Sequence, residues 1–229
     1  MPIRTEEGWI EVYQKKDALW IHDGNPSRPH ALLSSGMHST GFFNSRLVIP
    51  DEALLREAAS DLVDSVEMSC DIVWVDRVVG PETGATKLAE FISDEIGKRR
   101  GRPCAWASPA KTGDGRNKSM AFRDPDRMVL PGETILLCED VLTTGGSVEL
   151  TAKASINARG TVMPFVVALV NRSGFKFAGG KRLIVLIDRA MPAWVPEECQ
   201  MCPESKPLFP KDPANWASLN ATYPEKENI

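Results

Sequence analysis

The sequence lacks a long apolar run and any surplus of positive charge. No hydrophobic stretch approaches the ~20 residues of a membrane-spanning helix, and residues 1–16 are polar and acidic, without the apolar segment of a signal peptide. The formal net charge is −4, so no general basic surface points to nucleic acid. We therefore expect a protein that binds neither membranes nor nucleic acid.

Cysteines are few, and their number, five, is odd. Cys70, Cys104 and Cys138 lie in apolar settings, where free thiols behave as small hydrophobic side chains. This usage favours a reduced, cytoplasmic protein over a disulfide-bonded one.

Cys199 and Cys202 have the spacing of a zinc knuckle. A structural zinc site needs four ligands, and no second pair or nearby histidine follows them in the sequence. A redox role is disfavoured because the pair does not open a helix after a strand. We expect packed free thiols, with zinc as the weaker alternative; the three histidines are far away in sequence: His22, His30 and His38.

The 229 residues suffice for one domain with a small appendage. Apolar residues at helical spacing alternate with short apolar runs, which predicts an α/β fold with a mostly parallel sheet flanked by helices. We expect a main domain over 1–191, including an N-terminal hood at about 1–50, and a Pro-rich, irregular tail over 192–229.

Four helices are predicted. The first is capped by Thr5 and its apolar stripe includes Trp20, the second is capped by Asp51, and the others cover 84–98 and 146–158. The predicted strands are 31–33, 42–49, 72–79, 104–107, 134–138, 162–170 and 183–187.

One segment carries most of the functional information. The apolar strand 134–138 is followed by Glu139 and Asp140, then by Thr143, Thr144, Gly145, Gly146 and Ser147, where a helix begins. Glycines let successive N–H groups converge, the helix start adds partial positive charge, and the hydroxyls add donors. The alternative, an ordinary loop, gives no reason for two adjacent acids, because paired like charges are costly.

The segment therefore predicts a phosphate cradle beside two carboxylates. It lacks the Gly-Lys-Ser/Thr of the nucleoside-triphosphate P-loop. A sugar monophosphate fits better, since carboxylates accept hydrogen bonds from sugar hydroxyls.

This segment resembles the phosphoribosyl pyrophosphate (PRPP) motif of type I phosphoribosyltransferases, and the flanking sequence is most similar to orotate phosphoribosyltransferases. The resemblance covers roughly 32–189. It implies that Glu139 and Asp140 hold the ribose hydroxyls and that residues 143–147 hold the 5-phosphate. Pro81, Glu82, Thr83 and Gly84, after Gly80, resemble the family's pyrophosphate loop.

The resemblance also suggests where a base would bind. Segment 34–44 is similar to the base-binding hood of the orotate enzymes, with Phe42 and Phe43 as the aromatic pair; such a pair is otherwise commonly part of a core. Arg172 matches the arginine that pairs with the orotate carboxylate, and Thr143 lies beside the same site. Ser34 stands where some family members carry lysine.

The polar stretch 108–131 has no core pattern and matches the family's mobile catalytic loop. It lacks the histidine usual there, so the catalytic cation stays open among Lys111, Arg116 and Lys118. The implied reaction is transfer of ribose 5-phosphate to a base, orotate above all, with Mg²⁺ bound mainly by the substrate. The family is typically homodimeric. Two alternatives stay open: transfer to another base, and a PRPP-sensing regulator without turnover.

Overall fold

The computed structural model describes residues 3–114 and 117–223, and its contacts divide the chain into two compact units. The first unit comprises Met1–Trp9 and Ile49–Arg189; the second comprises Ile10–Val48 and Ala190–Ile229. The sequence assigned the N-terminal hood to the main domain and set the tail apart. The structure instead groups tail and hood segment in one unit, because their strands pair with each other.

A six-stranded sheet forms the centre of the first unit, in the order β11-β12-β10-β9-β5-β6. All neighbours pair in parallel except β11, which is antiparallel to β12. The carboxyl ends of β5, β9 and β10 therefore meet at one edge. The strands are β5 (Arg77–Val79), β6 (Ala105–Ala107), β9 (Thr134–Leu142), β10 (Thr161–Asn171), β11 (Phe177–Ala178) and β12 (Lys181–Asp188).

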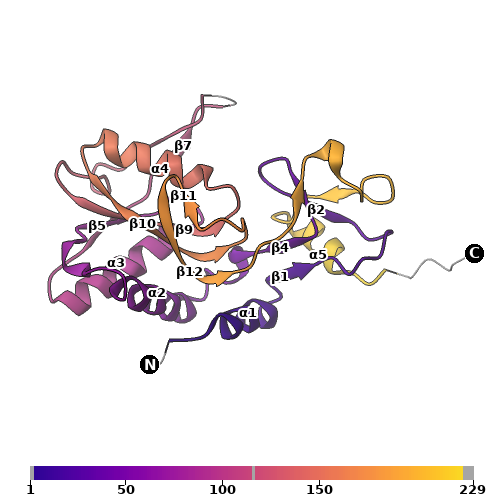
Figure 1. Ribbon diagram of the computed structural model, residues 1–229, viewed down its shortest axis with the longest axis horizontal. Coiled ribbons are helices and arrows are strands. Elements are labelled where there is room, and N and C mark those ends of the chain that lie inside the picture. Colours follow the sequence, from indigo (N-terminus) through magenta and orange to yellow (C-terminus); the bar gives the residue numbers. More distant parts are fainter. Residues whose placement is uncertain (1–2, 115–116, 224–229) are drawn as a thin grey trace, which may run out of the picture. The chain divides into compact units, whose positions relative to one another are not determined.

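Helices cover both faces of this sheet, as the sequence predicted (Figure 1). Helices α2 (Glu52–Glu67) and α3 (Thr86–Arg100) pack together on one face, and α4 (Gly146–Asn157) covers the other. The Asp51 side chain caps α2 by accepting from the N–H of Leu54 at 3.1 Å. Alternate residues of β9 and β10 pack beneath α4 in one core, which includes Ile135, Leu137, Val148, Ala152, Val166 and Ala168.

Two predicted strands are shorter than expected. In 72–79 the Asp71 carboxylate caps a 3-10 turn, η2 (Ile72–Trp74), and only Arg77–Val79 remains for β5. In 42–49 the extended chain ends at Phe43, because the next residues form a second turn, η1 (Ser45–Leu47). Conversely, β9 runs past 138 to Leu142, so the acidic pair lies within the strand.

The polar stretch 108–131 contains regular structure that its composition did not predict. β7 (Ala110–Thr112) and β8 (Ser119–Ala121) form an antiparallel ribbon. Met120 is buried, and its sulfur accepts a hydrogen bond from the Thr151 hydroxyl of α4 at 3.0 Å. Two buried side chains, Ala110 and Met120, thus attach an otherwise largely exposed ribbon to the first unit.

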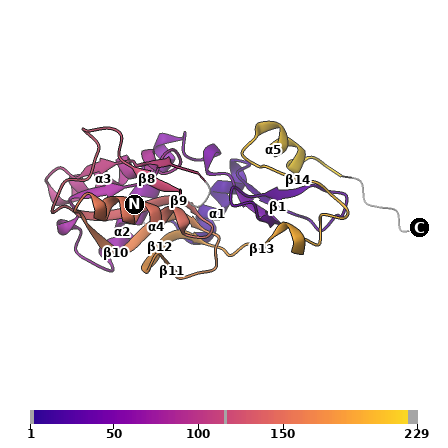
Figure 2. The same cartoon turned by 90° about the horizontal axis from the view of Figure 1, so that it is seen from above.

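The second unit interleaves chain segments that are far apart in sequence (Figure 2). Its four-stranded sheet has the order β13-β3-β2-β14, and a separate antiparallel pair joins β1 to β4. The elements are β1 (Leu19–Ile21), β2 (His30–Leu32), β3 (His38–Ser39), β4 (Gly41–Phe43), β13 (Ala193–Trp194), η4 (Pro196–Glu198), β14 (Pro207–Leu208) and α5 (Pro213–Asn220).

Helix α1 (Glu6–Lys15) begins as expected, with the Thr5 hydroxyl accepting from the N–H of Gly8 at 3.1 Å. It does not reach Trp20: the chain turns at Asp17, which has a φ of +50°, and Trp20 lies on β1. There the Trp20 indole donates to the Leu219 carbonyl at 2.8 Å. The tail, expected to be irregular, therefore supplies strands, a helix and part of a core.

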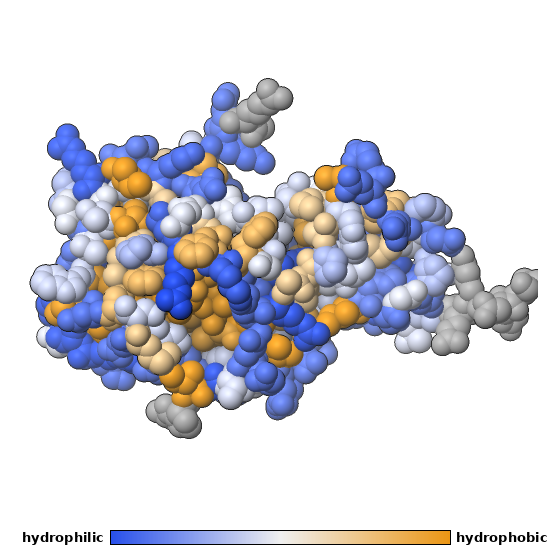
Figure 3. All heavy atoms as spheres, in the orientation of Figure 1, coloured by the Kyte–Doolittle hydropathy of each residue, from blue (hydrophilic) through white to orange (hydrophobic). Residues whose placement is uncertain are grey.

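Hydrophilic side chains dominate the face of the molecule seen in Figure 3, with apolar side chains in scattered groups. Within the described ranges, no helix combines the length and the hydropathy that a membrane span requires.

Candidate functional site

The two adjacent acids lie at the carboxyl edge of the parallel sheet. Glu139 is buried on β9, opposite Ala168 of β10, while Asp140 is partly exposed. One Glu139 oxygen, Oε1, accepts from the Asp140 N–H at 3.1 Å. The other, Oε2, accepts no hydrogen bond from any described residue. A buried carboxylate oxygen without a donor is costly, and a sugar hydroxyl or a cation would satisfy it.

Burial raises the pKa of Glu139 well above its usual range, and the neighbouring charge of Asp140 adds to the rise. The Asp140 N–H and the positive charge of Lys111 oppose it. The site thus carries a strongly perturbed carboxyl group, as active sites commonly do.

The segment after the acids forms the start of α4. Gly145 occupies the N-cap with a φ of +79°, a left-handed conformation that favours glycine. Glycine has no side chain that could cap the helix, so the first N–H groups of α4 are open to an external anion. Thr143 and Ser147 are partly exposed and Thr144 is exposed, which leaves their hydroxyls accessible. The geometry fits the predicted phosphate cradle.

The loop after β5 lies against the acidic pair. β5 and β9 pair in register, Val79 opposite Leu137, so both loops leave the same edge. A Cβ built on Gly84 would lie 2.5 Å from Oδ2 of Asp140. Only a glycine permits this approach of backbone to carboxylate. Within the same loop, Pro81 is buried, whereas Glu82 and Thr83 are exposed.

The ribbon carries one cation toward this edge. Lys111 lies on β7, exposed, and close enough to Glu139 for its charge to act on that carboxyl group. Lys118 is also exposed, just before β8. Arg116 lies outside the described residues. Of the two candidates for the catalytic cation that the structure describes, Lys111 is the one whose charge acts on Glu139.

Arg172 directly follows β10, and its N–H donates to the Leu142 carbonyl at 2.9 Å. The residue is only 2% exposed, and burial lowers the pKa of its guanidinium to about 10. It is therefore still charged at neutral pH. The parallel register sets it next to the end of β9, where Thr143 begins the cradle.

Phe42 and Phe43 lie in the second unit, and both are buried. Phe42 packs against Trp216 of α5, with ring centroids 5.9 Å apart, and Phe43 meets Tyr13 edge-on at 5.2 Å. The pair thus contributes to the core of that unit.

The second unit gives Cys199 and Cys202 neighbours that the sequence did not reveal. Two histidines that are far away in sequence, His30 and His38, lie beside them, and the four potential ligand atoms are within 4.8 Å of one another. Burial, together with the charges of His38 and His22, lowers the pKa of His30 to about 4, so its ring is neutral at pH 7. Only the spacing of the cysteines was visible in the sequence.

No family model matches the chain, but curated relatives do. The chain is 31% identical to an orotate phosphoribosyltransferase of Heliobacterium modesticaldum over 209 residues, covering 90% of this chain and 96% of the relative. It is 30% identical to the Nitratiruptor enzyme of that name over 213 residues, 87% and 98% of the two chains.

Solved structures share the fold. The orotate phosphoribosyltransferase of Aeropyrum pernix matches with a TM-score of 0.52 at 23% identity, over 77% of this chain and 91% of that one. The Mycobacterium tuberculosis enzyme, solved with Fe(III) dicitrate, matches with a TM-score of 0.53 at 19% identity, over 80% and 95%. Two relatives at 30% identity or more are matched over nearly their whole length. The chain therefore belongs to the orotate phosphoribosyltransferase family.

Proposed function

We propose that this protein transfers ribose 5-phosphate from PRPP to orotate, giving orotidine 5-monophosphate and pyrophosphate, at the carboxyl edge of the first unit's sheet. The observation that carries the proposal is the buried Glu139 oxygen without a donor, placed beside an open helix start and a glycine loop. The curated relatives named orotate phosphoribosyltransferase support the choice of reaction.

In the proposed complex the acidic pair accepts hydrogen bonds from the ribose 2- and 3-hydroxyls. Residues 143–147 and the N–H groups of α4 bind the 5-phosphate, as helix starts commonly do. Residues 81–84 bind the pyrophosphate through backbone N–H groups. In this proposed arrangement the ribose hydroxyls, the 5-phosphate and the pyrophosphate each have their own group of residues at one edge of the sheet.

The base nitrogen then attacks ribose C1 from the face opposite the pyrophosphate. The new N–C1 bond forms as the C1–O bond breaks, and the electron pair of the C1–O bond leaves with the pyrophosphate oxygen, so the configuration at C1 inverts. The proton of the attacking N–H is lost in the same reaction, and the released pyrophosphate or water accepts it. Positive charge develops on the sugar and negative charge on the leaving group. Positioning and electrostatic stabilisation account for the catalysis, and the reaction needs no covalent enzyme intermediate.

The ribbon of β7 and β8 supplies the cations of this scheme. Lys111 is the leading candidate because its charge already reaches Glu139, and Lys118 and Arg116 are the others. A ribbon closed over the leaving group would exclude water, which otherwise captures the sugar cation.

Mg²⁺ fits the donors at this edge. Hard cations prefer oxygen ligands, and Glu139 and Asp140 offer carboxylate oxygens, one of them without a protein donor. The ion would be held mainly by PRPP oxygens, with these two residues beside it. When bound, it would offset the charge of the leaving pyrophosphate.

For the base, Arg172 is the proposed partner of the orotate carboxylate, since a guanidinium fork matches a carboxylate in two hydrogen bonds. Thr143 is proposed to lie at the base as well. Phe42 and Phe43 stay candidates from the family resemblance, and their burial favours an indirect role through packing.

We also infer a homodimer in the cytoplasm. Family resemblance suggests the dimer, and light scattering after size exclusion tests it against a monomer. The cysteines, all unpaired by disulfides in the structure, favour a reducing compartment.

The test of the proposed reaction is pyrophosphate release. Protein, Mg²⁺ and PRPP are incubated with orotate, adenine, uracil or no base. We expect release that depends on orotate. Release with another base alone would reassign the acceptor, and PRPP binding without release under any condition would favour a regulator without turnover.

A further inference from the structure

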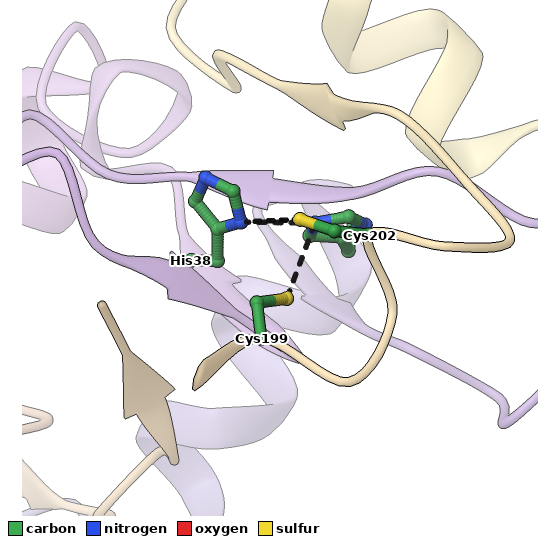
Figure 4. Close-up of side chains that lie close together, drawn as sticks. His38, Cys199 and Cys202 are labelled. Carbon is green, nitrogen blue, oxygen red and sulfur yellow. Dashed lines mark hydrogen bonds between the residues drawn. The ribbon is translucent and has the colours of Figure 1, made fainter. Parts of the chain in front are cut away.

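Four metal-ligating side chains lie together in the second unit, and none of them is among the residues assigned to the reaction. They are His30, His38, Cys199 and Cys202, of which the first three are buried. Figure 4 shows Cys202 directed at His38 from a loop of the tail, with Cys199 on the same loop. Two strands and one loop thus point their ligand atoms at one position.

Strand pairing explains how residues so far apart in sequence meet. His30 is on β2 and His38 on β3, adjacent antiparallel strands. The loop with both cysteines connects β13 to β14, and each of these strands is anchored next to a histidine: Trp194 opposite His38, and Pro207 opposite His30. The loop is therefore held over the β2–β3 hairpin at both ends.

Four of the six distances between the ligand atoms agree with the edges of a tetrahedron around zinc. With Zn–S of about 2.3 Å and Zn–N of about 2.05 Å, tetrahedral geometry separates sulfur from nitrogen by about 3.6 Å and two nitrogens by about 3.3 Å. Nε2 of His30 lies 3.5 Å from Sγ of Cys199 and 3.6 Å from Sγ of Cys202. Nδ1 of His38 lies 3.2 Å from Sγ of Cys202 and 3.2 Å from Nε2 of His30.

Hydrogen bonding alone does not account for this packing. Nε2 of His30 has three polar neighbours within 3.6 Å, yet a neutral ring nitrogen makes one good hydrogen bond. Its other ring nitrogen lies 3.0 Å from the Ser205 hydroxyl, which donates to the Met201 carbonyl. Nδ1–H then donates to Ser205, and Nε2 presents its lone pair to the cluster, the outer-shell arrangement typical of metal-bound histidine.

A metal ion that cross-links these segments would stabilise the second unit, which is small. Its strands are two or three residues long, and the core cluster around Trp20 and Phe42 has five buried members. Small units of this kind are commonly stabilised by disulfides or metals. A metal bound here would join the tail loop to the hairpin that leads, four residues after His38, into Phe42.

We propose that His30, His38, Cys199 and Cys202 bind one Zn²⁺ as a structural site. Two thiolates and two imidazoles in tetrahedral positions select zinc, and four protein ligands leave no open position for a substrate. The site is separate from the proposed reaction and stands whether or not orotate is the acceptor.

The test begins with the full chain purified without added chelator, its metal content measured by mass spectrometry. We expect one zinc per chain. The Cys199→Ser/Cys202→Ser variant should lose it, while the matched control Cys70→Ser, in the first unit, should retain it. Chelation of the wild type should lower its melting temperature, and added Zn²⁺ should restore it.

A measurement on the wild type alone avoids any folding defect of the variant. After chelation, reconstitution with Co²⁺ should give the visible spectrum of a tetrahedral ion with thiolate charge-transfer bands, and X-ray absorption of the zinc form should show two sulfurs and two nitrogens. Failure of the chelated wild type to bind Zn²⁺ or Co²⁺, iron in place of zinc in the purified chain, or full zinc content in the double cysteine variant would each overturn the proposal.

Discussion

The contact between Gly84 and Asp140 gives the sharpest prediction about the site. In Gly84→Ala the added methyl would lie 2.5 Å from Oδ2 of Asp140, about 0.9 Å inside the 3.4 Å at which ordinary contact begins. Gly84 has no left-handed backbone angle, so alanine causes no strain there. The atoms that must move form the carboxyl group at the end of one side chain, and we expect the fold to survive with little change in melting temperature.

Activity should respond differently from stability. Displacing a catalytic group by about 1 Å costs on the order of 100-fold in rate. We therefore expect Gly84→Ala to lower kcat/KM for PRPP by about two orders of magnitude, measured by pyrophosphate release with orotate saturating. A matched control is Gly8→Ala in α1, whose methyl would lie 2.7 Å from the Arg4 side chain, outside the site; it should keep wild-type activity.

A double-mutant cycle identifies the cause. If Gly84→Ala acts by displacing the Asp140 carboxylate, it should cost little more once that carboxylate is removed in Asp140→Ala. Full additivity, or wild-type activity in a folded Gly84→Ala protein, would refute the reasoning.

Three further predictions concern other parts of the site. Burial and Asp140 raise the pKa of Glu139, so the folded state binds a proton at this group more tightly than the unfolded state, which loses it above about pH 4.3. Glu139 therefore makes the stability of the protein fall as the pH rises. Glu139→Gln should melt at a higher temperature than the wild type at pH 8, the difference should vanish near pH 4, and turnover should drop. Equal melting curves at both pH values would contradict this. Arg172→Ala should weaken orotate use by about 1.5–3 kcal/mol in kcat/KM with little change for PRPP, and equal damage to both substrates would argue against a carboxylate contact. Residues 108–131 should gain hydrogen-exchange protection with PRPP and Mg²⁺, whereas protection unchanged by ligand would identify a fixed loop.

Local patterns were sufficient to predict the parallel sheet, the covering helices and the sequence of acids, glycines and helix start. These features depend on neighbours within a few residues: Asp51 caps its own helix, and Gly145 begins α4. The parallel register then brings the two loops together, because parallel strands end at a common edge.

Features that depend on the pairing of segments far apart in the sequence could not be predicted from local patterns. The tail joins the hood segment only through β13 and β14, and this pairing brings His30 and His38 to the cysteines across more than 160 residues. Trp20 fits the predicted helical stripe, yet a turn at Asp17 places it on a strand. The ribbon in 108–131 depends on two buried side chains, Ala110 and Met120, that are isolated within a largely polar stretch.

The most direct test of the central claim compares the wild type with Asp140→Asn in the presence of Mg²⁺, PRPP and orotate. Losing a hydrogen bond to a charged group costs about 1.5–3 kcal/mol, or roughly 10- to 150-fold. We predict that the wild type consumes orotate with one pyrophosphate released per orotate, and that a folded Asp140→Asn protein is slower by that factor. Equal orotate consumption by the two proteins would contradict the assignment of the acidic pair to PRPP.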